Sequence, residues 1–121
     1  MKNVFNSSNK NIGLLGLGTV GQAVYDEINT NVSSVLVKDI AKKRNINISE
    51  TNIINDFQKI LEDENINIII ELIGGETPAY DYIKNSIKSH KNVITANKEV
   101  MGKYGKELLD LAEKNNVFLL Y

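Results

Sequence analysis

Short apolar runs alternate along the chain with segments whose apolar residues recur every three or four positions. The short runs predict buried β-strands at residues 12–15, 32–37, 52–54, 66–73, 93–95 and 117–121. The periodic segments predict helices that run from about residue 20 to 28, over 56–64, from 78 to the turn at 90, and from a start between 97 and 104 to about 115. Strands and helices that alternate at this spacing predict an α/β fold, with a parallel sheet and helices on both faces.

The spacing of apolar residues also predicts which side of a helix is buried. Val20, Val24 and Ile28 recur every four positions and predict one apolar face on the first helix. The run at residues 66–73 is the most apolar in the chain, and its β-branched content is typical of a central strand covered on both faces. The last helix is expected to direct four apolar residues into the core: Leu108, Leu109, Leu111 and Ala112.

A glycine-rich turn joins the first strand to the first helix. Gly16, Gly18 and Gly21 fit the G-x-G-x-x-G pattern, which here follows a strand and opens a helix, as the pattern requires. The first glycine permits a tight turn, the second lets a pyrophosphate approach the backbone, and the third allows close packing of the helix. The N–H groups and the positive dipole end of the helix favour phosphate. The stretch therefore predicts dinucleotide binding, with a purely structural turn as the alternative.

The predicted elements and the glycine turn together define a topology. Right-handed crossovers, with a nucleotide site at the switch point of the sheet, give the strand order 3-2-1-4-5-6 of a Rossmann-type, doubly wound parallel sheet. A ligand then lies over the carboxyl ends of the strands. Four segments are expected to converge there: residues 16–21, Lys38, residues 73–76 and residues 95–98.

The end of the second strand bears on the choice between NAD and NADP. Asp39 lies about 20 residues after the glycines, where an acidic residue accepts a hydrogen bond from the 2′-OH of NAD. Lys38 and the cluster at residues 42–44 are cationic and favour the 2′-phosphate of NADP. We therefore expect NADP or NAD as the cofactor, with the cations favouring NADP. A solvated loop is the alternative interpretation of residues 42–44.

Composition and charge narrow the functional classes. The 121 residues suffice for one domain, which we expect at residues 11–121 after a polar lead-in at residues 1–10. A formal net charge of −1 gives no electrostatic case for nucleic acid or an anionic membrane. The chain has no cysteine, so no disulfide and no thiolate metal site are expected, and no metal-binding residue is assigned. Because neither a signal peptide nor a membrane-spanning run is apparent, a cytoplasmic location is expected.

Three segments together resemble homoserine dehydrogenase: GLGTVG at 16–21, ELIGGETPA at 71–79 and VITANKEVMGKYGKEL at 93–108. The resemblance extends over nearly the whole chain from Ile12 onward, and implies the N-terminal NAD(P)-binding domain of that family. The implied activity is the NAD(P)-dependent interconversion of L-homoserine and L-aspartate 4-semialdehyde, in threonine and methionine biosynthesis. The alternatives are the cofactor domain of a related enzyme such as aspartate dehydrogenase, and a free-standing, non-catalytic nucleotide-binding module.

The resemblance also assigns roles to residues. It implies that Lys98 lies beside the nicotinamide and the substrate carbonyl, where an ammonium can polarise the carbonyl or take part in proton transfer. A cation gains nothing from the dipole at a helix N-terminus, which favours a ligand-facing role over that of an ordinary exposed lysine. The implied cofactor-binding residues are Gly16, Leu17, Gly18, Thr19, Val20, Gly21, Lys38, Ile73, Gly74, Gly75, Thr95 and Lys98.

Two features depart from the family pattern. The link from Gly21 to the second strand is shorter than usual, so we expect a trimmed first helix. The family's substrate-binding and dimerisation region lies beyond Tyr121, and we therefore expect this chain to bind NAD(P) without oxidising homoserine on its own. The parent enzyme is expected to be a homo-oligomer. The apolar last strand would form an exposed sheet edge, which predicts self-association of the chain.

Overall fold

The computed structural model describes residues 9–44, 48 and 51–121. Within these residues, six strands form one parallel sheet in the order β3-β2-β1-β4-β5-β6, which confirms the order expected from the sequence. The strands are β1 (Ile12–Leu15), β2 (Val32–Leu36), β3 (Asn52–Ile54), β4 (Ile68–Glu71), β5 (Asn92–Thr95) and β6 (Leu119–Leu120). The helices are α1 (Thr19–Ile28), α2 (Phe57–Glu62), α3 (Ala79–Lys88) and α4 (Lys98–Lys114), with a 3-10 turn η1 (Asn29–Asn31). Residues 1–8 of the predicted lead-in lie outside the described residues.

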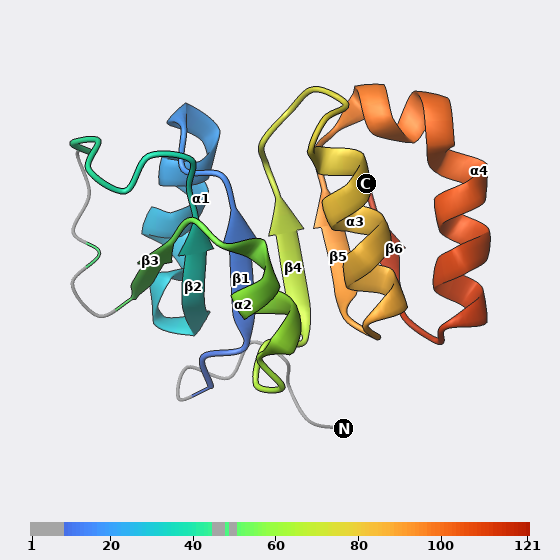
Figure 1. Ribbon diagram of the computed structural model, residues 1–121, viewed down its shortest axis with the longest axis horizontal. Coiled ribbons are helices and arrows are strands. Elements are labelled where there is room, and N and C mark those ends of the chain that lie inside the picture. The colour runs from blue at the N-terminus through green and yellow to red at the C-terminus, as the bar shows by residue number, and fades with distance from the viewer. Residues whose placement is uncertain (1–8, 45–47, 49–50) are drawn as a thin grey trace.

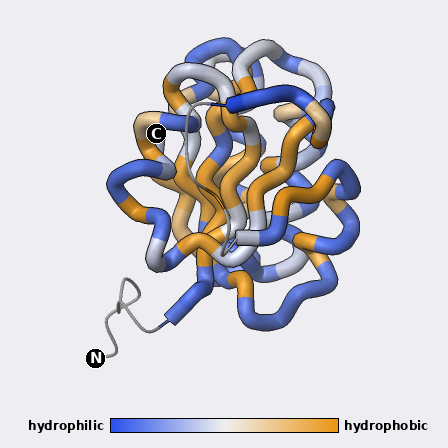
Figure 2. Tube along the Cα trace, turned by 90° about the vertical axis from the view of Figure 1, so that its left-hand side faces the viewer, coloured by the Kyte–Doolittle hydropathy of each residue, from blue (hydrophilic) through white to orange (hydrophobic). Residues whose placement is uncertain are grey.

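The helices cover both faces of the sheet (Figure 1). α1 places Tyr25 in an apolar cluster with Leu14 of β1 and Ile68 of β4. The opposite face carries a second cluster around Ile69, to which the other three helices contribute Ile60, Ile83 and Leu108. Successive residues of β4 thus point to opposite clusters, as the period of a strand requires. Figure 2 shows the strands as the hydrophobic centre of the chain and the outer turns as hydrophilic.

The buried sides of two helices differ from the predicted ones. On α1 the buried residues are Gly21 and Tyr25, whereas Val20 is 58% exposed, so its assignment to the apolar face was wrong. The close contact of Gly21 with the preceding turn sets the rotation of α1 and turns Val20 outward. On α4 the prediction holds for Leu108 and Ala112, but Leu109 is 36% exposed.

Side-chain caps fix the starts of two helices. Asp56 precedes α2 and its carboxylate accepts a hydrogen bond from the Gln58 N–H (3.0 Å). Asn97 precedes α4 and its Oδ1 accepts from the Val100 N–H (3.0 Å). β4 is shorter than the predicted strand at 66–73, because the chain leaves the sheet after Glu71. The residues released from the strand form the β4–α3 loop (residues 72–78), which borders the site.

Candidate functional site

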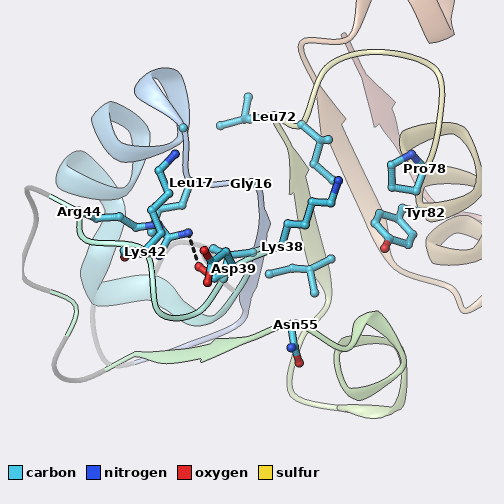
Figure 3. A pocket seen from close by; sticks show the side chains of 14 residues that line it. Gly16, Leu17, Lys38, Asp39, Lys42, Arg44, Asn55, Leu72, Pro78 and Tyr82 are labelled. Carbon is cyan, nitrogen blue, oxygen red and sulfur yellow. Dashed lines mark hydrogen bonds between the residues drawn. The ribbon is translucent and has the colours of Figure 1, made fainter.

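A cavity of about 640 Å³ lies at the carboxyl ends of the first four strands (Figure 3). Its volume is within the range of small-molecule pockets. The glycine turn after β1 forms one side, the segment after β2 forms another, and the β4–α3 loop with the start of α3 lies opposite. The described part of the chain therefore places a concave site where the parallel order of the strands predicts one.

Each glycine of the turn has a different physical role. Gly16 has a φ of +99°, which glycine adopts without strain. A Cβ on Gly21 would lie 2.4 Å from the carbonyl oxygen of Gly16, so the start of α1 packs against the turn only if this residue is glycine. A Cβ on Gly18 would meet nothing within 4 Å, and Gly18 lines the cavity. The protein's own packing therefore leaves Gly18 free to be replaced.

Charged side chains gather in the segment that follows β2. Lys38, Asp39, Lys42 and Arg44 all line the cavity. The guanidinium of Arg44 donates to the carbonyl oxygens of Lys42 (2.8 Å) and Asp39 (2.9 Å), which closes the segment into a compact loop. One carboxylate oxygen of Asp39 accepts from the Ala41 N–H (3.0 Å). Three cations and one carboxylate thus give this end of the cavity a positive character.

The opposite wall is apolar and combines Ile73, a predicted site residue, with Leu72, Pro78 and Tyr82, which were not predicted as site residues from the sequence. Leu72 and Ile73 follow β4, while Pro78 and Tyr82 come from the start of α3 (Figure 3). The Tyr82 ring stacks on Phe57 of α2 with 4.1 Å between ring centroids, which fixes its position. The sequence contained a signal for this wall, since carboxyl ends of neighbouring parallel strands meet at one edge of a sheet.

The ends of β4 and β5 meet beside the cavity in a buried polar network. The fully buried carboxylate of Glu71 accepts hydrogen bonds from the Ile73 N–H (2.8 Å) and the Gly74 N–H (3.3 Å), and from the Thr95 hydroxyl (2.5 Å). The side-chain amide of Asn97 donates to the Gly75 carbonyl (2.6 Å). Backbone groups of the β4–α3 loop are therefore fastened to the end of β5.

A second contact joins the β4–α3 loop to α4 at the surface. The carboxylate of Glu76 accepts from the Tyr104 hydroxyl and pairs with the Lys103 ammonium (3.0 Å). The Tyr104 hydrogen bond and then Lys103 lower the pKa of Glu76. The same bond raises the pKa of Tyr104, because the carboxylate favours the protonated hydroxyl. The loop is thus tethered to α4 at two points, Gly75 and Glu76.

The structure separates the sequence-predicted site residues into three groups. Gly16, Leu17, Gly18, Lys38 and Ile73 line the cavity. Thr19, Val20 and Gly21 form the first turn of α1. The remaining residues surround the ends of β4 and β5 next to the cavity: Gly74, Gly75, Thr95 and Lys98. Lys98 is the first residue of α4 and its side chain is exposed.

The sequence itself matches a known family. Residues 16–121 fit the profile described as homoserine dehydrogenase, NAD binding domain. The chain belongs to this family. The homoserine dehydrogenase of Bacillus subtilis (strain 168) is 35% identical over 117 residues, which cover 86% of this chain and 27% of the relative. The homoserine dehydrogenase of Lactococcus lactis subsp. lactis is 36% identical over 126 residues, which cover 92% of this chain and 29% of the relative.

Solved structures of the family have the same fold. The crystal structure of S. aureus homoserine dehydrogenase at pH 7.5 matches with a TM-score of 0.86 and 40% sequence identity, covering 93% of this chain and 31% of that one. The chain thus spans less than a third of the length of these relatives. None of the helices in the described ranges has the length and apolarity needed to span a bilayer.

Proposed function

We propose that residues 11–121 form a domain that binds a nicotinamide dinucleotide in the cavity and supplies the cofactor site of a homoserine dehydrogenase. The observation that carries this proposal is the turn at residues 16–21, where Gly18 faces open space at the start of a helix. The N–H groups of the first turn of α1 have no partner within the helix and suit a pyrophosphate. The proposal is supported by the cavity lining, which includes five of the cofactor-binding residues proposed from the sequence: Gly16, Leu17, Gly18, Lys38 and Ile73.

We further propose NADP as the preferred dinucleotide. Lys38 and Lys42 are exposed at the cavity wall, where their ammonium groups suit a 2′-phosphate. The backbone bonds of Arg44 hold the loop that presents Lys42. Asp39, the candidate partner of a 2′-OH, already uses one carboxylate oxygen within its own loop.

The proposed activity of the whole protein is L-homoserine oxidation and the reverse reduction of L-aspartate 4-semialdehyde. The dinucleotide, when bound, accepts or donates the hydride. Lys98 is the proposed catalytic residue, whose ammonium polarises the substrate carbonyl or moves the proton of its oxygen. Asn97 caps α4 and thereby fixes the backbone from which Lys98 projects.

The location and assembly of the protein are proposals of the same kind. We propose that the protein is cytoplasmic and that the parent enzyme is a homo-oligomer. The 121-residue chain is itself proposed to self-associate through β6, an edge strand with apolar side chains.

Calorimetric titration of the chain with NADPH and NADH tests the proposal. Gly18→Val is expected to weaken the binding of both dinucleotides on the order of 100-fold, since the side chain takes up the space of the pyrophosphate. Gly105→Val is the matched control: its Cβ meets only the Met101 Cε at 3.6 Å, far from the cavity, and binding should persist. Lys38→Ala is expected to weaken NADPH binding about tenfold and NADH binding by less than about twofold.

Two results would decide against these assignments. A folded chain that binds neither dinucleotide contradicts the proposed function. If Lys38→Ala lowers the affinity for NADPH and for NADH equally, the assignment of Lys38 to the 2′-phosphate is contradicted.

A further inference from the structure

Glu71 is a buried carboxylate without a cationic partner. Its residue is 0% exposed, and none of the ion pairs among the described residues includes it. Its charge is instead balanced by three hydrogen-bond donors: the N–H groups of Ile73 and Gly74 on Oε2, and the Thr95 hydroxyl on Oε1. Such a group is costly to bury, so its position calls for a physical reason beyond packing.

The hydroxyl of Thr95 continues the network toward α4. While it donates to Glu71, it accepts from the Asn97 backbone N–H (3.0 Å), so both of its roles are fixed. Asn97 in turn caps α4 through Oδ1, which accepts from the Val100 N–H. Through the Thr95 hydroxyl, the carboxylate of Glu71 therefore fixes the backbone position of Asn97, the residue immediately before Lys98.

The network closes into a ring at the β4–α3 loop. The Asn97 side-chain amide donates to the Gly75 carbonyl (2.6 Å), one residue after Gly74, whose N–H donates to Glu71. The loop and the first turn of α4 thus share a single set of bonds, and neither can shift without breaking a bond of the other. Coupling of this kind is expected where each buried group has its hydrogen-bonding capacity taken up.

A carboxylate suits this ring better than an amide does. Three donors converge on Glu71, and an ionised carboxylate has only acceptor sites. Glutamine has nearly the same shape but would present an NH₂ group either to backbone N–H donors or to the Thr95 hydroxyl. In the first arrangement the backbone N–H groups lose their acceptor; in the second the Thr95 oxygen accepts from the amide, and its own O–H loses the Glu71 acceptor.

We propose that Glu71 is a positioning residue, which holds the β4–α3 loop and the Lys98 end of α4 in one fixed relative geometry through Thr95 and Asn97. This inference rests on the proposed function, because the loop borders the proposed cofactor cavity and Lys98 is the proposed catalytic residue. It adds a role for the buried Glu71–Thr95–Asn97 ring: dinucleotide contact with the loop is coupled to the orientation of Lys98.

Native-state amide hydrogen exchange tests the coupling without any ligand. In Glu71→Gln and in Thr95→Val, the Val100 N–H is expected to exchange at least about tenfold faster than in wild type. This N–H donates to Asn97 and forms no hydrogen bond with either altered side chain. Thr95→Ser keeps the hydroxyl and should retain the slow rate. Thr51→Val is the matched control, since it removes another buried threonine hydroxyl, bonded to Tyr25 (2.7 Å), outside the cavity. Unchanged Val100 exchange in both Glu71→Gln and Thr95→Val would overturn the proposal.

NADPH titration, with the lysines labelled as ¹³C-dimethyl groups for NMR, tests the functional part. The NADPH-induced shift of the Lys98 signal is expected to be lost in Thr95→Val, with binding weakened about tenfold, and both should persist in Thr51→Val. A wild-type chain that does not bind NADPH contradicts the proposed function, while the exchange data still decide whether the ring couples the two elements. Binding in wild type with an unaltered Lys98 response in Thr95→Val overturns the positioning role alone.

Discussion

At the start of α1, the Cα of Gly21 lies so close to the carbonyl oxygen of Gly16 that a Cβ would come within 2.4 Å of it. Gly18, three residues earlier, has no such neighbour. The two glycines of one motif are therefore distinguishable by experiment, because one is constrained by the fold and the other only by the proposed ligand.

Replacement of Gly21 by alanine is expected to destabilise the chain by about 3 kcal/mol, since either the turn or α1 must move to relieve the clash. Gly105→Ala in α4 is the matched control, because its Cβ makes only an ordinary contact with Met101. That variant should be more stable than wild type by about 0.5 to 1 kcal/mol, from helix propensity. Urea unfolding measures both, and a wild-type midpoint for Gly21→Ala would contradict the constraint.

Sequence reasoning at the level of single residues succeeded where the backbone decides and failed where packing does. The glycine turn was predictable, because φ and close approach restrict the residue type. The outward position of Val20 was not, since it depends on how Gly21 rotates the helix against the turn. The ring around Glu71 includes bonds between residues 22 and 24 positions apart, and a pattern of local spacing contains no information about such partners.

At the scale of elements, the loop between α2 and β4 is fastened by a buried lysine. The ammonium of Lys91, at the amino end of β5, donates to the carbonyls of Asp63 (2.9 Å) and Ile66 (2.5 Å). Burial lowers the pKa of Lys91, against the smaller opposing effects of the Asp63 and Glu64 carboxylates. The burial of Lys91 was not predicted from the sequence, because a lysine is seldom so deeply buried.

Lys91→Met is expected to cost about 2 kcal/mol at pH 7, because two carbonyls lose their donor. The folded-state pKa lies below the unfolded value of 10.5, so the unfolded chain binds more protons between the two values. Wild-type stability should therefore gain a contribution as pH rises through that window, and Lys91→Met should lack it. Urea unfolding at pH 7 and pH 10.5 measures the difference, and an identical pH response in both proteins would contradict the assignment.

Helix and strand types were predictable from periodicity, whereas several ends were not. The helix predicted over residues 56–64 begins after its cap Asp56 and ends at Glu62. The predicted strand at 66–73 included Leu72 and Ile73, which lie in the loop because the Glu71 carboxylate takes the Ile73 N–H. An apolar run alone does not distinguish a strand from the apolar wall of a site that directly follows it.

For the whole molecule, the strand order followed from few rules. Right-handed crossovers and the position of the glycine turn suffice to place β1 at the centre, and the structure has that order. The same rules placed the site at the carboxyl edge of the sheet. They did not predict that the cavity and Lys98 would lie at different places along that edge. The cavity lies between the ends of β2 and β4, and Lys98 lies beyond it at the end of β5, joined through the Asn97–Gly75 bond.

The exposed edge of the sheet yields a prediction about association. Within the described residues β6 pairs only with β5, and Leu120 and Tyr121 are 53% and 75% exposed. An apolar edge strand with free backbone groups favours pairing with a second copy, so the 121-residue chain should show a concentration-dependent monomer–dimer equilibrium in sedimentation. Leu120→Lys puts a charge on this edge and should yield monomers at the same concentration. Ile40→Lys, which replaces an exposed apolar residue after β2, should leave the equilibrium unchanged. Strictly monomeric wild-type protein at high concentration would show that the β6 edge does not mediate self-association.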